Sequence, residues 1–266
     1  MRAELLDIAI EAAHRAGELL MESFRGDREE VSTKTSPTDL VSKADRDAER
    51  FLLDFITSKR PGDGMLAEEG GRAESSTGYR WVVDPLDGTV NFLFRIPVWG
   101  VSLAVEDPDG ALVGVIHDPN RSETFSAGRG RGAWLNDRRL RVSDRTDLST
   151  ALIGTGFAYG VDSRIAQARI AAKVLGGVRD IRRAGSAALD LCSVACRRLD
   201  GFYEAYTQPW DRAAGALIVT EAGGTVSEGP APVGEGTTIF ASNEVLHTDL
   251  RRLVLGDSLP ATTHEE

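Results

Sequence analysis

Residues 81–92 read Trp81-Val82-Val83-Asp84-Pro85-Leu86-Asp87-Gly88-Thr89-Val90-Asn91-Phe92, an apolar run that ends in two acids. The apolar run is typical of a buried strand, so the carboxylates of Asp84 and Asp87 are expected to emerge together at its end. Pro85 restricts the backbone between them, and Gly88 permits a tight turn whose free amides can face an anion if a helix follows. The stretch therefore combines ligands for a hard cation with a place for a phosphate group.

Asp-Pro and Asp-Gly pairs also form ordinary turns, so the stretch 84–89 needs support from elsewhere in the chain. A second copy of the pattern, at 107–110, is interpreted only as a hairpin turn. Two further acidic segments accompany the first, because Glu68-Glu69 follows a short apolar run and Asp211 opens a predicted helix. Carboxylate and carbonyl oxygens suit magnesium, whereas zinc is disfavoured because no nitrogen or sulfur ligands lie nearby.

The overall charge limits the partners of this chain. Its 266 residues include 41 acidic and 31 basic side chains, for a formal net charge of -10, which argues against a general electrostatic grip on nucleic acid or anionic lipid. An anionic substrate must then meet local positive charge, and bound metal ions are one way to supply it. No direct contact with nucleic acid is expected.

The chain carries no sequence sign of export. No apolar stretch approaches the roughly 20 residues that cross a bilayer, and residues 1–17 lack the pattern of a signal peptide, so we expect a cytoplasmic protein without membrane contact. The two cysteines, Cys192 and Cys196, share a face of a predicted helix, which excludes a disulfide framework. A zinc pair is the alternative, but no histidine stands close by, so buried structural thiols are predicted.

Hydrophobic periodicity predicts a mixture of helices and strands. A first amphipathic helix is predicted over 5–24, with an inward stripe at Leu5, Ile8, Ala12, Ala16, Leu19 and Ser23. A polar loop at 31–39 and a capping pair, Ser42 with Asp45, precede a second helix. Strands are predicted at 81–83, 98–105 and 111–116, the last two as an antiparallel hairpin. The later half alternates strands near 151–153, 202–204, 225–226 and 238–241 with helices over 163–175, 186–198 and 211–221, so one compact layered unit is expected.

Four motifs occur together in this order: Asp39-Leu40-Val41-Ser42-Lys43-Ala44-Asp45, Glu68-Glu69, Asp84-Pro85-Leu86-Asp87-Gly88-Thr89 and Trp210-Asp211-Arg212-Ala213-Ala214-Gly215. In order and spacing this set resembles the inositol monophosphatase family of lithium-sensitive, magnesium-dependent sugar phosphatases, over nearly the whole chain. The resemblance implies an α+β fold, a layered α-β-α-β-α sandwich, and usually a homodimer. Within a single unit spanning 1–266, residues 1–145 would form an N-terminal α+β half with the metal motifs, and residues 146–266 a C-terminal α/β half.

The resemblance further implies two magnesium ions, with a third, weaker one beside Glu68. Glu68, Asp84 and the carbonyl of Leu86 match the ligands of the first ion. Asp84, Asp87 and Asp211 match the ligands of the second. These five residues form the expected metal set.

The remaining matched residues concern catalysis and the substrate. Thr89 paired with Asp45 resembles the dyad that orients the attacking water, and Lys34 matches a basic loop residue near the metals. Catalysis is therefore assigned to Thr89, Asp45, Asp87 and Glu68. Substrate contacts are assigned to Gly88, Thr89, Asp87, Asp211, Gly185, Ser186, Ala187 and Glu204. One departure is Ala67, where many relatives have glycine, and it should perturb a turn slightly.

The implied function is that of a phosphoric monoester hydrolase that acts on a small phosphate monoester, with myo-inositol monophosphate as the expected substrate. Fructose 1,6-bisphosphate, histidinol phosphate and 3'-phosphoadenosine 5'-phosphate are the alternatives, because related families share the metal motifs. A non-enzymatic role in a transcription complex is a further alternative, since some bacterial members of the family are associated with transcription machinery. A calcium-binding structural domain would use similar acids but leaves Thr89 with Asp45 unexplained.

Overall fold

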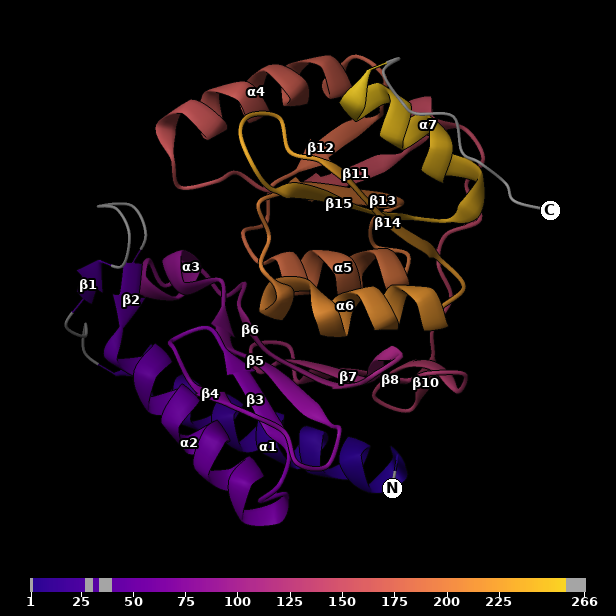
Figure 1. Cartoon of the computed structure of the whole chain (residues 1–266). Helices are drawn as coiled ribbons and strands as arrows, with labels where there is room; N and C mark the ends of the chain where they lie inside the picture. The colour runs from indigo at the N-terminus through magenta and orange to yellow at the C-terminus, as the bar shows by residue number, and fades with distance from the viewer. Residues whose placement is uncertain (1, 27–30, 34–39, 257–266) are drawn as a thin grey trace.

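The computed structural model of the chain describes residues 2–26, 31–33 and 40–256. Layers of helix and sheet alternate through the molecule: two long helices, an eight-stranded sheet, two central helices, a five-stranded sheet and two outer helices (Figure 1). Each amphipathic element buries its apolar face against a neighbouring layer. The layered α-β-α-β-α sandwich expected from the sequence is thereby confirmed.

The first layer consists of α1 (Arg2–Arg25) and α2 (Lys43–Lys59), which pack on the eight-stranded sheet and on each other. The predicted stripe of α1 is partly wrong, because Leu19 is 42% exposed. The buried face consists of Leu5, Ala9, Ala12, Ala13, Ala16, Gly17 and Leu20. A Cβ at Gly17 would lie 2.7 Å from the ring of His117 on β7 (Gly110–Asp118), so the helix approaches the sheet too closely for larger side chains.

The chain enters α2 through a short antiparallel ladder of β1 (Val31–Thr33) with β2 (Leu40–Ser42). The predicted loop at 31–39 is therefore wrong at its start, where the backbone is extended. Ser42 then caps α2, with reciprocal hydrogen bonds between Ser42 and Asp45. This capping box confirms the predicted capping pair.

The eight-stranded sheet is antiparallel except for one pair of strands. Its order is β10 (Arg138–Arg139), β9 (Gly132–Leu135), β8 (Glu123–Gly128), β7, β6 (Gly100–Asp107), β5 (Arg80–Asp87), β3 (Gly64–Ala67) and β4 (Arg72–Ala73). Strands β3 and β5 run parallel. The predicted hairpin of β6 and β7 is confirmed, with its turn at 107–110, although β6 begins at Gly100 rather than at Val98. The prediction gives no bounds for β3, β4 and β8–β10, whose residues show little of the alternation that marks a strand, although the run at 128–132 is expected to be a turn after a strand.

The second half of the chain builds the five-stranded sheet and the helices around it. The strand order is β12 (Asp180–Arg182), β11 (Leu152–Thr155), β13 (Gly201–Ala205), β15 (Thr237–Ser242) and β14 (Thr225–Pro230). Helices α4 (Val161–Leu175) and α7 (Glu244–Leu255) cover one face, and α5 (Ala187–Ala195) and α6 (Pro209–Glu221) lie between the two sheets (Figure 1). Short helices α3 (Thr89–Leu93) and η1 (Leu148–Thr150) complete the described elements. Helix α5 ends before the predicted Arg198, because Arg197 has a φ of 70°.

The central helices are held between the sheets by close contacts. A Cβ at Gly114 on β7 would lie 2.9 Å from the backbone oxygen of Ala214 on α6. A Cβ at Gly215 on α6 would lie 2.6 Å from the Leu191 side chain on α5. These contacts leave α5 and α6 little freedom to shift, and both helices begin at the site described below.

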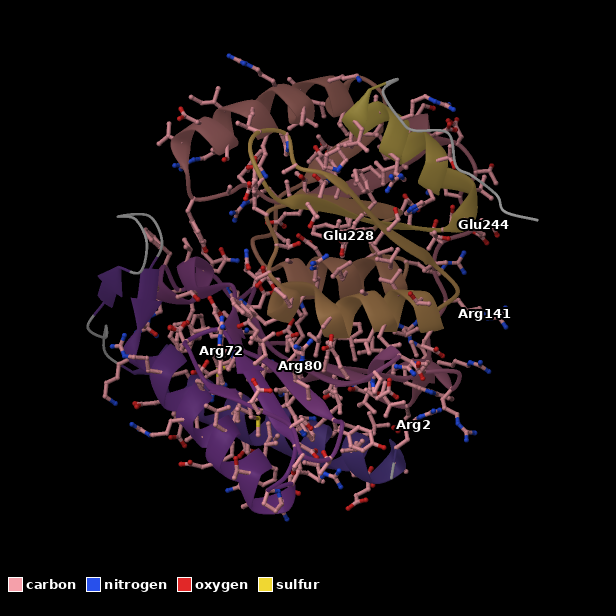
Figure 2. The ribbon with its side chains drawn as sticks, viewed as in Figure 1. Arg2, Arg72, Arg80, Arg141, Glu228 and Glu244 are labelled. Carbon is pink, nitrogen blue, oxygen red and sulfur yellow. The ribbon has the colours of Figure 1, made fainter. Side chains whose placement is uncertain are left out.

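The cysteines form no disulfide, and several surface charges form ion pairs among the described residues. Cys192 and Cys196 are free and buried, as predicted. Figure 2 labels Arg80 on β5 and Glu228 on β14 among the surface charges. Arg80 pairs with Glu106 on β6, and Glu228 pairs with Arg212 on α6. Exposed pairs of this kind contribute little to stability individually. Within the described ranges, the helices are too short or too polar to cross a membrane.

We expect Gly114→Ala to lower the free energy of unfolding by about 1–3 kcal/mol, because the added methyl group would press on a backbone oxygen that cannot rotate away. Gly176→Ala is the matched control, since Gly176 has a φ of -73° and its added Cβ would make an ordinary 3.5 Å contact. Urea denaturation followed by circular dichroism measures both changes. Equal free energies of unfolding for the two variants would contradict the close contact.

Candidate active site

Two of the predicted acidic segments meet because β3 and β5 run parallel. In their register Ala67 lies beside Val83, and the amide of Glu68 donates a hydrogen bond to the carbonyl of Val83 at 3.2 Å. Glu68 and Asp84 therefore lie next to each other at the carboxyl ends of adjacent strands. The carboxyl group of Glu68 is one of the neighbours that raise the pKa of Asp84.

The end of β5 departs from regular pairing with β6. Asp84 pairs with Ser102, whereas Asp87 pairs with Gly100, so the strand is irregular between the two acids. The amide of Leu86 donates to the Asp84 carboxylate at 3.0 Å instead of to the neighbouring strand. Both acids line the cavity described below.

A glycine turn links β5 to α3. Gly88 has a φ of 103°, and a Cβ at this position would lie 2.9 Å from the Val98 carbonyl oxygen and 3.1 Å from the Trp99 Cβ. Glycine is therefore required by both the backbone conformation and the lack of space. Helix α3 follows directly at Thr89, so the tight turn that Gly88 permits does lead into a helix, although the helix is short.

Thr89 and Asp45, which are distant in sequence, are in direct contact. The Thr89 hydroxyl lies 2.9 Å from Asp45 Oδ1 and 3.1 Å from the Leu86 carbonyl oxygen. The other carboxylate oxygen of Asp45 accepts hydrogen bonds from the Ser42 amide at 2.8 Å and the Ser42 hydroxyl at 2.5 Å. Burial raises the pKa of Asp45, although the hydrogen bonds from Ser42 and Thr89 oppose that rise.

Two central helices direct their first turns toward the same acids. Asp211 lies in the first turn of α6, where its Oδ2 accepts a hydrogen bond from the Gln208 amide at 2.6 Å. At the start of α5, Asp87 Oδ2 accepts hydrogen bonds from the Ser186 hydroxyl and from the Ala188 amide, the latter at 2.8 Å. The N-terminus of a helix carries partial positive charge, so α5 and α6 offset part of the negative charge of these two carboxylates.

Most of the predicted site residues line one cavity of about 480 Å³. They are Glu68, Asp84, Leu86, Asp87, Gly88, Thr89, Gly185, Ala187, Glu204 and Asp211. Asp45 and Ser186 are outside this wall and contact it from behind, through Thr89 and Asp87. Lys34 lies outside the described residues.

The acids concentrate negative charge in the cavity. Burial raises the pKa of Asp84 well above its ordinary value, and the nearby carboxylates of Glu68, Asp87 and Asp211 raise it further. The pKa of Asp211 rises for the same reasons, and burial raises that of Asp87 to about 6 against the hydrogen bonds at the start of α5. Among the described residues that line the cavity, Arg183 is the one basic side chain. The cavity therefore favours a cation.

The chemistry of the donors suits a hard divalent cation. The cavity wall offers carboxylate oxygens from Glu68, Asp84, Asp87 and Asp211 and a carbonyl from Leu86, and its described residues include no histidine or cysteine. In the described part of the chain, no three acidic, histidine or cysteine side chains are already arranged so that they could hold a metal ion. Magnesium prefers oxygen ligands and keeps several waters, so it fits a shared, partly hydrated site of this kind.

The sequence did not indicate several residues of the cavity wall, among them Arg183 and Gly156. A Cβ at Gly156 would lie 2.1 Å from the Glu204 carboxylate, so glycine makes the space that Glu204 occupies. Burial and then the charge of Asp190 raise the pKa of Glu204 to about 8, while Arg183 opposes that rise. Arg183 stands two residues before the predicted substrate-binding turn at Gly185. This nearness in sequence is the signal that could have indicated Arg183 as a residue of the cavity wall. Nothing in the sequence around Gly156 marks its role, which depends on a different strand.

Comparison with known proteins places the chain among similar sequences and folds. It matches the model of the inositol monophosphatase family over residues 1–255. It is 40% identical over 257 residues to the inositol-1-monophosphatase of Mesorhizobium japonicum, covering 95% of this chain and 97% of that protein. It is 43% identical over 227 residues to the Nus factor SuhB of Escherichia coli K12, covering 84% of this chain and 85% of that protein. The crystal structure of the extragenic suppressor protein suhB from Bartonella henselae is similar with a TM-score of 0.88 and 38% identity, covering 96% of this chain and 100% of that one.

Without divalent cations, the chain should become less stable as the pH rises toward 8. The pKa of Glu204 is about 8 in the folded protein against an ordinary value of 4.5, so its protonated form stabilises the fold at low pH and this stabilisation is lost as the pH rises. Glu204→Gln should flatten the dependence between about pH 5 and pH 8. Thermal unfolding in chelator at a series of pH values measures this dependence. A change of 1 kcal/mol in the free energy of unfolding shifts Tm by about 2–4 °C in a chain of this size.

The exposed Glu235 provides a control for the loss of one negative charge. Glu235→Gln should keep the wild-type pH dependence of Tm. The assignment would be contradicted if Glu204→Gln and Glu235→Gln followed the same curve as the wild type.

Proposed function

This chain belongs to the inositol monophosphatase family, and we propose that it is a magnesium-dependent phosphomonoesterase that releases phosphate from a small polyol phosphate, foremost myo-inositol monophosphate. The observation that carries the proposal is the convergence of Glu68, Asp84, Asp87 and Asp211 on one cavity, with the contact between Thr89 and Asp45 at its wall. Four carboxylates would repel a phosphate ester unless cations lie between them and the substrate.

We assign the metal ligands as the match of the motifs to those of the inositol monophosphatase family implies. Glu68, Asp84 and the Leu86 carbonyl would hold one magnesium ion, and Asp84, Asp87 and Asp211 a second. A third ion, if it binds, would lie beside Glu68. Bound magnesium supplies neutralisation of the phosphate oxygens, a lower pKa for the attacking water and stabilisation of the leaving alkoxide.

Thr89 and Asp45 would orient and deprotonate the attacking water. The Thr89 hydroxyl has one proton, which it donates to Asp45 Oδ1 or to the Leu86 carbonyl, so its oxygen is left to accept a hydrogen bond from water. As the water loses its proton to the Thr89 oxygen, the Thr89 proton can pass to Asp45. The raised pKa of Asp45 suits it to accept this proton, and Ser42 holds its other oxygen in place.

The remaining wall would bind the rest of the substrate. The amides of Gly88 and Thr89, after Asp87, would face phosphate oxygens at the start of α3. Glu204, Gly185 and Ala187 would contact the polyol, because they line the cavity with the acids. Glu204 suits hydroxyl groups and would also accept a hydrogen bond from an amine.

The substrate class has alternatives that share the same metal chemistry. Fructose 1,6-bisphosphate, histidinol phosphate and 3'-phosphoadenosine 5'-phosphate differ from myo-inositol monophosphate in the group that faces Glu204. Lithium sensitivity, a homodimeric assembly and a cytoplasmic location also stay predictions of the sequence. They are not needed for the chemistry proposed here.

A second candidate function is a role in transcription, favoured by the 43% identity to the Nus factor SuhB of E. coli. The two functions do not exclude each other, because an interaction surface can lie outside the cavity. An Asp87→Asn variant that lost hydrolysis but still recovered transcription proteins in a pulldown would favour this second function.

Magnesium should support phosphate release from myo-inositol monophosphate, and chelation should abolish it, because the buried acids otherwise repel the phosphate group. Calcium should inhibit, since it is larger and prefers more protein ligands than magnesium. A phosphate-release assay over the four candidate substrates, with each metal and with chelator, measures this. Equal activity in chelator would contradict the metal requirement, and a higher kcat/KM for another substrate would change the assigned substrate.

Asp87→Asn and Asp211→Asn should each lower kcat by roughly 10³-fold, equivalent to about 4 kcal/mol in the activation free energy, because each removes a charged metal ligand. The fold should be retained, since both side chains repel their neighbours in the absence of metal. Asp7→Asn, at an exposed position of α1, is the control for the loss of one charge. Near-normal turnover in either site variant would refute the ligand assignment.

A further inference from the structure

A buried glutamate on α2 has no role in the mechanism proposed above. Glu49 is 6% exposed and stands one helical turn after Asp45. Its Oε2 accepts a hydrogen bond from the Glu69 amide at 2.7 Å, and its Oε1 accepts one from the Gly71 amide at 3.2 Å. The carboxylate thus binds the backbone of a different segment, with one oxygen for each of two amides.

The segment that Glu49 binds is the turn that carries Glu68. Gly70 has a φ of 113° in this turn, and the Ala67 amide donates to the Gly71 carbonyl at 2.8 Å. The amides of Glu69 and Gly71 donate instead to the Glu49 carboxylate. The direction of the Glu68 side chain therefore depends on a turn whose two ends are held by a carboxylate of α2.

The turn is packed directly against α2, so it has little room to adjust. A Cβ at Gly71 would lie 2.4 Å from Leu53 Cδ1 and 3.3 Å from Glu49 Oε1. Leu53 is one turn after Glu49 on the same helix. Residues four apart lie on one helix face, so Asp45, Glu49 and Leu53 connect the turn to the contact with Thr89 through a single rigid element.

We propose that Glu49 is a positioning residue that holds the turn at 68–71 and thereby sets the affinity of the cavity for divalent cations through Glu68. The inference rests on the proposed function, because it takes Glu68 as a metal ligand. Two acceptor oxygens match the two amide donors, and glutamine would offer one acceptor and a competing donor. The residue touches neither the substrate nor the reacting atoms and acts only through the backbone of the turn.

The test compares Glu49→Gln and Glu49→Asp with Asp54→Asn, a control that removes a charge from an exposed position of the same helix. Isothermal titration calorimetry with magnesium chloride should give a dissociation constant raised by about tenfold in the Glu49 variants and unchanged in the control. At saturating magnesium, kcat should change by less than about threefold, because the groups that touch the substrate are intact. Hydrogen exchange at the amides of Glu69 and Gly71 should be faster in the Glu49 variants.

The outcomes separate this inference from the proposed function. If the wild type bound magnesium but hydrolysed none of the four substrates, the proposed function would fail. The magnesium dissociation constants of the wild type and the Glu49 variants, measured by calorimetry, would still test the role of Glu49. Unchanged magnesium affinity in both Glu49 variants would overturn the inference, even with faster exchange at the two amides. Loss of the native circular dichroism spectrum in both variants would also overturn it, because Glu49 would then support the fold as a whole.

Discussion

Mutual repulsion between carboxylates that lie side by side in one cavity, with Asp84 buried and its neighbours half-buried, is the constraint on which the site depends. Asp84 is buried next to Glu68, Asp87 and Asp211, and each neighbour makes its ionised form less favourable. The fold offsets part of this cost with donors from the central helices, as when the first turn of α5 donates to Asp87. Such an arrangement persists only where the surrounding layers are packed too closely to relax, as at Gly114 against Ala214.

The same constraint links stability to function in an acidic chain. With a net charge of -10, the protein as a whole does not attract a phosphate ester, and cations held by the acids are needed to reverse the sign of the field locally. The acids therefore destabilise the metal-free fold and prepare the site for metal at the same time. Helix α2 contacts the site at two points: Asp45 contacts Thr89 in the cavity wall, and Glu49 holds the turn that carries Glu68.

Local patterns predicted those elements whose signals are contained in a few residues. The capping pair of Ser42 with Asp45 and the hairpin turn at 107–110 were predicted correctly, because each depends on neighbours in the chain. The errors arose where tertiary contacts override the pattern. Leu19 was predicted to face inward, but the alanine-rich face of α1 permits a closer approach to the sheet. The end of α5 was placed too late because the backbone change at Arg197 has no strong local signal.

The sequence by itself determined which residue types stand at the end of β5, that Gly88 permits a tight turn there, and the family to which the motifs belong. Only the tertiary structure decided that β3 lies parallel to β5 and brings Glu68 beside Asp84. It also decided that Gly156 makes space for Glu204. The physical reason is that short-range patterns specify local backbone conformation and exposure. The distance between side chains of different segments depends on how closely the layers pack, which involves residues far apart in the chain.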